Sequence, residues 1–156
     1  MGVALRTLDL TRVALSAISL GGARAALDAA LQYSKEHEQF GGPIATKQII
    51  QKYVADAATE VEAMRHLVYH AAWLVDKGKL ATHDASMVKL FCSTAAFRIA
   101  NSMLQVHGGY GYMKEYAIER MYRDFRALEI IEGTSQIQRF LIARRLYKDR
   151  GLEIQP

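Results

Sequence analysis

Scarcity of certain residues sets the first limits on this chain. One cysteine in 156 residues excludes an intrachain disulfide and indicates an intracellular compartment, either the cytoplasm or an organelle matrix such as the mitochondrial matrix. No apolar run reaches the roughly 18 residues of a membrane span, and the N-terminus lacks the basic-then-apolar layout of a signal peptide. His66 and His70 share one helix face, but no carboxylate completes a metal-binding pattern, so no metal site is expected.

The net charge of the chain is also small. The chain has 20 Lys and Arg against 16 Asp and Glu, and the positive residues are dispersed, so a nucleic-acid partner is not expected. A hydrophobic fraction of 51% with 23% charged residues is typical of a folded globular protein. The length suits one domain, residues 1–156. Cys92 lies in an apolar helical stretch and is interpreted as a buried hydrophobic residue rather than a nucleophile.

Only two prolines are present, both outside long periodic stretches, which favours helix. Apolar residues recur at helical spacing in five stretches, and we expect Asp9 to cap the first of them. Gly21 and Gly22 inside that first helix indicate close packing of a neighbour. Short turns between long helices predict an all-α fold, an antiparallel up-down bundle. The expected helices are residues 9–35, 44–77, 82–107, 117–126 and 135–149.

The segment from Ile131 to Gln138 contains one carboxylate, Glu132, directly before a glycine and a helix start. Thr134 or Ser135 can cap that helix, and Ser135 with Gln138 fits a capping box. Glu132 therefore lies just outside a helix N-terminus, among apolar neighbours, where shielding from water would make it a stronger base. The alternative interpretation is a solvated carboxylate that interacts with the helix dipole.

Two glycine-rich segments are ordinary turns on their own evidence. Residues 105–112, with sequence QVHGGYGY, end a helix and expose backbone N–H groups. Residues 39–44, with sequence QFGGPI, form a turn that carries Phe40 beside two glycines. A large aromatic side chain in such a turn is often there to pack against a partner or ligand.

Taken together, these segments resemble the C-terminal helical domain of the acyl-CoA dehydrogenase flavoproteins over residues 8–147. The resemblance rests on QFGGPI at 39–44, QVHGGYGY at 105–112, YRD at 122–124 and EGTSQIQR at 132–139. It implies FAD-dependent α,β-dehydrogenation of an acyl-CoA thioester, in which a carboxylate removes the α-proton while a hydride passes to the flavin. It also implies a homo-oligomer, a dimer or tetramer, and an electron-transfer flavoprotein as redox partner.

The resemblance implies a role for each matching residue. Glu132 matches the catalytic base, and in the family the thioester carbonyl is bound by a flavin hydroxyl and by the backbone N–H of that glutamate. Asp9 lies near the position that some subfamilies use for their base and is the second candidate. The implied binding residues are Phe40, Gln48, Gln105, Gly108, Gly109, Thr134 and Gln136 for FAD, and Asp9, Arg12, Gly133 and Arg144 for acyl-CoA.

Three departures from the family pattern matter. His37 stands where the family usually has arginine, so a phosphate contact there becomes pH-dependent or is lost. Ile131 replaces a tyrosine common in relatives, so a different acyl-chain preference is expected. The family's N-terminal helical domain and middle β-domain are absent, which predicts an inactive isolated domain with little FAD affinity and a shortened reading frame. The alternatives are an acyl-CoA oxidase and a non-catalytic helical oligomerisation module.

Overall fold

The computed structural model describes residues 2–154, apart from the side chains of residues 2, 3 and 5. Over this range the chain forms five α-helices and two short 3-10 helices, joined by turns. The all-α prediction is confirmed. The elements are α1 (Gly2–Glu36), η1 (Ile44–Thr46), α2 (Gln48–Asp76), α3 (Thr82–His107), η2 (Gly108–Tyr112), α4 (Ala117–Leu128) and α5 (Ser135–Lys148).

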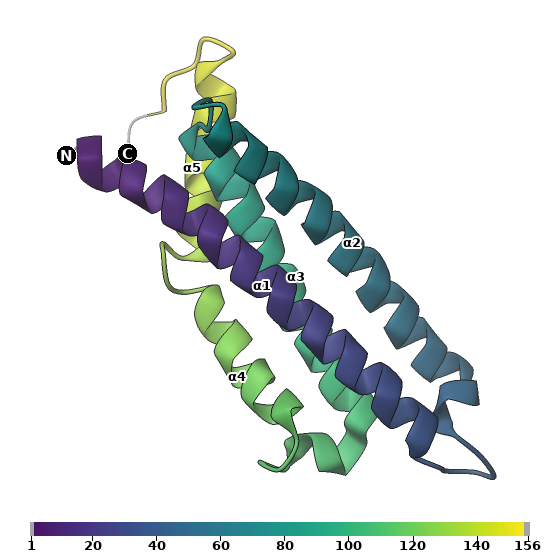
Figure 1. The fold of residues 1–156 in the computed structure, drawn as a ribbon. Coiled ribbons are helices and arrows are strands. Elements are labelled where there is room, and N and C mark those ends of the chain that lie inside the picture. Colours follow the sequence, from purple (N-terminus) through teal and green to yellow (C-terminus); the bar gives the residue numbers. More distant parts are fainter. Residues whose placement is uncertain (1, 155–156) are drawn as a thin grey trace.

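The three long helices α1, α2 and α3 run up and down beside one another, and α4 and α5 follow one after the other along the opposite side of α3 (Figure 1). Helix α3 is central, because it contacts each of the other four helices. The loop between α4 and α5 therefore lies against the middle of the bundle, beside the first half of α1 (Figure 1). The expected antiparallel up-down bundle is confirmed, with its fourth position shared by two shorter helices.

The beginning of the first helix differs from the prediction. Helix α1 starts at Gly2, so Asp9 lies inside it and is not its N-cap. The residues before Asp9, such as Leu5, Thr7 and Leu8, do not break helices, and the polar side chain of Asp9 does not prevent the helix from starting earlier. Asp9 instead pairs with Arg12 one turn later, at 3.0 Å between Oδ1 and Nη1.

The core consists mainly of small and aliphatic side chains from α1 and α3. Gly22 meets the ring of Phe125 on α4 so closely that a Cβ atom would lie 2.4 Å from Cζ, as the glycine pair predicted. Gly21 faces open space, so the prediction holds for one of the two glycines. Cys92 is fully buried, and burial raises the pKa of its thiol to about 12, which makes it an unreactive core residue.

By length and composition alone, one helix within residues 2–154 qualifies as a membrane span. The stretch Arg6–Glu36 has a mean hydropathy of 1.2 in its most apolar window, although the sequence shows no long apolar run. Part of this helix is buried within the protein itself, including Arg12, Ser16 and Ser19. Buried polar side chains with hydrogen-bond partners inside the bundle are typical of the core helix of a folded domain. Such a helix can also have the length and hydropathy of a membrane span.

Candidate functional site

Glu132 lies in the loop that joins α4 to α5, residues 129–134. Its φ of 55° and the φ of 90° at Gly133 place two successive residues in the left-handed region. This conformation is unfavourable for a glutamate and favourable for a glycine, so the surrounding structure must hold it. A strained non-glycine residue of this kind is often found at a functional site.

Side chains from two helices hold the backbone of Glu132 and Gly133. Arg12 on α1, which is 6% exposed, donates from Nε to the carbonyl of Glu132 at 3.2 Å. Gln138 on α5 donates from Nε2 to the carbonyls of both Glu132 (3.2 Å) and Gly133 (3.0 Å). Gln138 is fully buried, and a Cβ on Gly133 would lie 2.7 Å from its Nε2, so a larger residue would push this amide away from the carbonyls that it binds.

Gln138 therefore does not complete the predicted capping box. Thr134 is the N-cap of α5, and its hydroxyl accepts a hydrogen bond from the N–H of Ile137 at 3.4 Å. Ser135 is already the first residue of the helix. The side chain of Gln138 turns toward the loop carbonyls because those inward-facing acceptors are buried and must be paired.

The carboxylate of Glu132 is half-buried and accepts a hydrogen bond from the Thr11 hydroxyl on α1, at 2.6 Å between Oγ1 and Oε2. The same hydroxyl lies 3.1 Å from the carbonyl of Leu8. A hydroxyl has one proton, so Thr11 donates to one of these two oxygens at a time. Sequence reasoning missed Thr11, since nothing local marks a threonine whose partner is 121 residues away.

Asp9 and Arg12 form a partly buried ion pair beside this loop. Both carboxylate oxygens of Asp9 are engaged, Oδ1 by Arg12 and Oδ2 by the hydroxyl of Thr82 at 2.7 Å. Asp9 also lines a cleft of about 710 Å³ together with Arg144. Three further basic residues line the same cleft: Arg6, Arg145 and Lys148. The lining also includes Glu153, so basic side chains outnumber carboxylates in the cleft that Asp9 and Arg144 share, while Arg12 points inward to the loop.

Lys89 on α3 is the second functional candidate that the sequence did not reveal. It is 0% exposed, and its ammonium group donates to the carbonyls of Gly133 (2.8 Å) and Glu129 (3.3 Å). Burial lowers its pKa to about 8, an effect that the nearby Glu129 and Glu132 oppose and Arg12 reinforces. A lysine among apolar residues at helical spacing was the available signal, because a buried charge requires specific partners.

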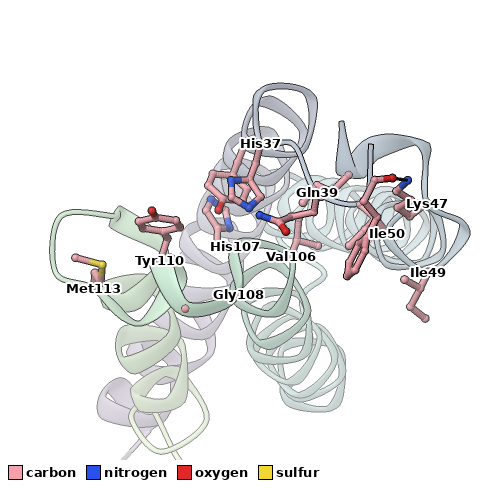
Figure 2. Close-up of a pocket in the computed structure, with 14 residues that line it drawn as sticks. His37, Gln39, Lys47, Ile49, Ile50, Val106, His107, Gly108, Tyr110 and Met113 are labelled. Atoms are coloured by element: carbon pink, nitrogen blue, oxygen red, sulfur yellow. Dashed lines mark hydrogen bonds between the residues drawn. The ribbon is translucent and has the colours of Figure 1, made fainter. Parts of the chain in front are cut away.

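A second region lies at the other end of α1, about 24 residues or roughly 36 Å along the helix from Arg12. Here a cleft of about 540 Å³ brings Phe40 together with Gly108 and Gly109. Figure 2 shows His37 and His107 near its middle, with Tyr110 and Met113 on one side and Lys47 and Ile50 on the other. Gln48 and Gln105 are exposed residues adjacent in sequence to lining residues, but they do not line the cleft.

The wall of this cleft is a stack of aromatic rings. Tyr33 lies between His37 and His107, with ring centroids 4.9 and 4.4 Å away. Burial lowers the pKa of His107 and so favours its neutral form, while its Nδ1 lies 2.7 Å from the carbonyl of Met103. In contrast, Phe40 is 91% exposed at a φ of 52°. An aromatic side chain held outward in this way offers an unfilled stacking surface.

Thr134 and Gln136 line a third hollow, of about 480 Å³, at the start of α5. Arg126 and Arg139 lie at the same hollow, close to a helix N-terminus that favours negative charge. The predicted site residues therefore fall into separate groups. Glu132, Gly133 and Arg12 meet at the loop, Asp9 and Arg144 at the basic cleft, Thr134 and Gln136 at this hollow, and Phe40, Gly108 and Gly109 at the far cleft.

Comparison with known proteins gives consistent matches. A family model described as acyl-CoA dehydrogenase, C-terminal domain, matches residues 1–147. A Bacillus subtilis protein named probable acyl-CoA dehydrogenase YngJ is 51% identical over 92% of this chain and 38% of its own length. The caffeyl-CoA reductase-Etf complex subunit CarC of Acetobacterium woodii is 49% identical over 93% of this chain and 38% of its own.

Solved structures agree with the sequence relatives. Butyryl-CoA dehydrogenase from Megasphaera elsdenii has a TM-score of 0.91 and 40% identity, over 93% of this chain and 38% of that one. The chain thus spans about two fifths of the length of the proteins that it matches. The chain belongs to the acyl-CoA dehydrogenase family and corresponds to its C-terminal domain.

Proposed function

We propose that this chain acts as the C-terminal, base-bearing domain of an FAD-dependent acyl-CoA dehydrogenase, with Glu132 removing the α-proton of the acyl thioester. The observation that carries the proposal is the conformation of the loop. Its carbonyls are bound from within by Arg12 and Gln138, and Glu132 is held at positive φ beside Gly133. The interior thus holds the main chain and leaves the carboxylate for chemistry.

The hydroxyl of Thr11 suits a carboxylate that gains a proton. Before the reaction it donates to the charged Oε2 of Glu132. Once Glu132 has taken the α-proton, its new O–H can donate to Thr11 Oγ1, whose own proton then turns to the carbonyl of Leu8. Both protonation states are therefore hydrogen-bonded without movement of the backbone. The N–H of Glu132 is the proposed donor to the thioester carbonyl, where negative charge develops.

The features around the far cleft fit a large aromatic cofactor with phosphate groups. Gly109 has open space where a Cβ would lie, so backbone amides there are accessible, and Phe40 offers a ring for stacking. We assign Phe40, Gln48, Gln105, Gly108 and Gly109 to FAD at this end, and Thr134 and Gln136 to FAD at the other. When bound, FAD supplies the hydride acceptor.

The separation of the two FAD-binding ends favours a homo-oligomer. Residues about 36 Å apart along α1 do not meet on one flavin unless a second copy brings its far cleft to the first copy's Glu132 loop. Exposed apolar side chains on α1 and α2 offer contact surface for such a dimer or tetramer: Ile18, Ile49, Tyr69 and Trp73.

The basic cleft beside α5 is the proposed binding site for the phosphates of acyl-CoA. Arg144 and Asp9 line it, and Arg12 links it to the loop through its ion pair with Asp9. An electron-transfer flavoprotein is the proposed redox partner, since the Acetobacterium woodii relative is named as a subunit of a reductase-Etf complex. Oxygen consumption by the reduced enzyme would instead indicate the oxidase alternative.

A chimera tests the proposal. This chain replaces the matching C-terminal region of butyryl-CoA dehydrogenase, and exchange of the α-proton of butyryl-CoA is measured in D₂O together with flavin absorbance. We expect the chimera to bind flavin and to exchange the α-proton. In its Glu132→Gln variant, the rate of α-proton exchange should fall by at least about 1000-fold.

Two further variants accompany it. Glu119→Gln, which alters a surface pair with Arg123, is the control and should retain proton exchange. Asp9→Asn tests the second candidate base: exchange at saturating butyryl-CoA should be retained, since both oxygens of Asp9 are already engaged, while KM should rise because Asp9 lines the proposed acyl-CoA cleft. Retained exchange in Glu132→Gln, or its loss in Asp9→Asn alone, would place the base elsewhere. A folded chimera that binds no FAD would contradict the proposed cofactor role.

A further inference from the structure

Lys89 is the largest fully buried side chain of the described residues, and burying a lysine costs free energy. Among those residues no carboxylate oxygen lies within 4.0 Å of its Nζ, so no direct ion pair offsets that cost. Its hydrogen bonds go to the carbonyls of Glu129 and Gly133. A bundle core made only for stability would place an aliphatic residue here, because apolar replacements of buried charges are often stabilising.

The two acceptors lie on either side of Glu132. The carbonyl of Glu129 begins the loop and also accepts the N–H of Ser135 at 3.0 Å, while the carbonyl of Gly133 ends it and also accepts from Gln138. Lys89 therefore bridges the two ends of the loop from the α3 side. Gln138 approaches the same loop from α5 and Arg12 approaches it from α1.

We propose that Lys89 is a positioning residue whose buried ammonium group joins the two ends of the 129–134 loop and so sets the direction of the Glu132 carboxylate. This inference rests on the proposed function of Glu132. Hydrogen bonds from a charged donor are about twice as strong as neutral ones, so the ammonium holds the carbonyls more firmly than an amine would. The charged and titratable groups that face it are Arg12 from α1 and Glu129 and Glu132 from the loop.

Removing Lys89 leaves each carbonyl with one other donor, Ser135 for Glu129 and Gln138 for Gly133. Lys89→Met should therefore fold, with stability equal to or above that of the parent, while the loop becomes mobile. If Lys89 served only stability, Lys89→Met would instead lower the free energy of unfolding and leave the mobility of the loop unchanged. This contrast gives a readout that does not depend on catalysis.

Hydrogen exchange on the 156-residue chain supplies that readout. In Lys89→Met we expect the Ser135 amide to exchange at least about tenfold faster, with amides in the middle of α1 unchanged. Val88→Ala is the matched control, a truncation of the neighbouring core residue on α3 that lowers global stability and keeps the Lys89 side chain and its two acceptors. If Ser135 keeps its protection in Lys89→Met, or loses it equally in Val88→Ala, the proposal is wrong.

Kinetics of the flavin-loaded chimera supply the second readout. Displacement of a base by about 1 Å can cost about 100-fold in rate, so Lys89→Met should lower kcat about 100-fold with KM within about threefold. Ethylamine added to Lys89→Ala should restore at least about tenfold of kcat, because its ammonium fits the vacated space. A raised KM with unchanged kcat would overturn a positioning role.

The two proposals can fail separately. If Glu132→Gln retains α-proton exchange, the proposed function is wrong, while the exchange rate of the Ser135 amide still decides whether Lys89 holds the loop.

Discussion

Among residues 2–154, two non-glycine residues have positive φ, Glu132 at 55° and Phe40 at 52°, and the loops that hold them are built differently. The Glu132 loop is surrounded by three helices whose buried side chains bind its carbonyls. The Phe40 turn is exposed and is closed by the bridge between Glu38 and Pro43 and by Lys47, which donates to the carbonyl of Phe40. One conformation is held by side chains from the interior of the bundle, whereas the other is held at the surface with its ring exposed.

The largest difference should come from adding a methyl group at the glycine of each loop. Gly133 and Gly41 have similar φ values, 90° and 84°, but a Cβ meets Gln138 Nε2 at 2.7 Å in the first and open space in the second. Gly133→Ala should lower the free energy of unfolding by about 3 kcal/mol, and Gly41→Ala by about 1 kcal/mol, which is conformational strain alone. Urea unfolding measures both, and equal losses would show that the Glu132 loop is not tightly packed.

Raising the pH should next distinguish the two regions through Lys89. Its pKa falls from 10.5 in the unfolded chain to about 8 in the folded one, so the folded chain binds fewer protons in that range and stability rises with pH above 8. Cys92 acts in the opposite direction from pH 9, because its folded pKa is raised to about 12. We expect a gain of about 1 kcal/mol between pH 8 and 9, followed by a plateau.

Lys89→Met is the control for this pH profile. It should abolish the gain between pH 8 and 9 and keep the loss at higher pH that Cys92 causes. Amide signals of Gly133 and Ser135 should shift with the same midpoint as Lys89, while those of Gly41 and Gly42 at the far turn stay constant. A profile that is identical in parent and variant would mean that Lys89 does not titrate in this range.

Replacing a threonine by valine in each region removes one hydrogen-bond donor, with a smaller expected loss of stability. Thr11→Val deletes the donor to Glu132, and the loss should be about 1 kcal/mol because the acceptor is charged and half-buried. Thr46→Val deletes a donor to the carbonyl of Pro43 in an exposed turn, where water replaces it and the loss should be a few tenths of a kcal/mol. Similar urea midpoints for the two variants would contradict the difference in burial.

The fold could largely be predicted from the sequence, because the apolar spacing of each helix is a local signal. The place of Glu132 in a turn directly before a helix start was also predicted, from the adjacent glycine and the capping residues, whereas its role as the base rests on the family resemblance and stays a prediction. Thr11 and Lys89 could not be predicted in the same way, since their partners lie 121 and 44 residues away and only folding brings them together. The predicted Asp9 cap was wrong because α1 already starts at Gly2, and the Ser135–Gln138 box was wrong because Gln138 donates to the buried carbonyls of Glu132 and Gly133 instead.

The smallest expected effect concerns the strain at the two positive-φ residues. Phe40→Gly removes an unfavourable backbone conformation and an exposed ring, so the chain should gain about 0.5 kcal/mol of stability or lose nothing. Glu132→Gly removes the same strain but also the hydrogen bond to Thr11, so the two effects should nearly cancel. Urea midpoints at pH 7 measure both variants. The Phe40→Gly variant should also be made in the FAD-loaded chimera. If the gain in stability is seen in the free chain but not in that chimera, the ring is retained for binding FAD. If Phe40→Gly already destabilises the free chain, Phe40 supports the turn itself.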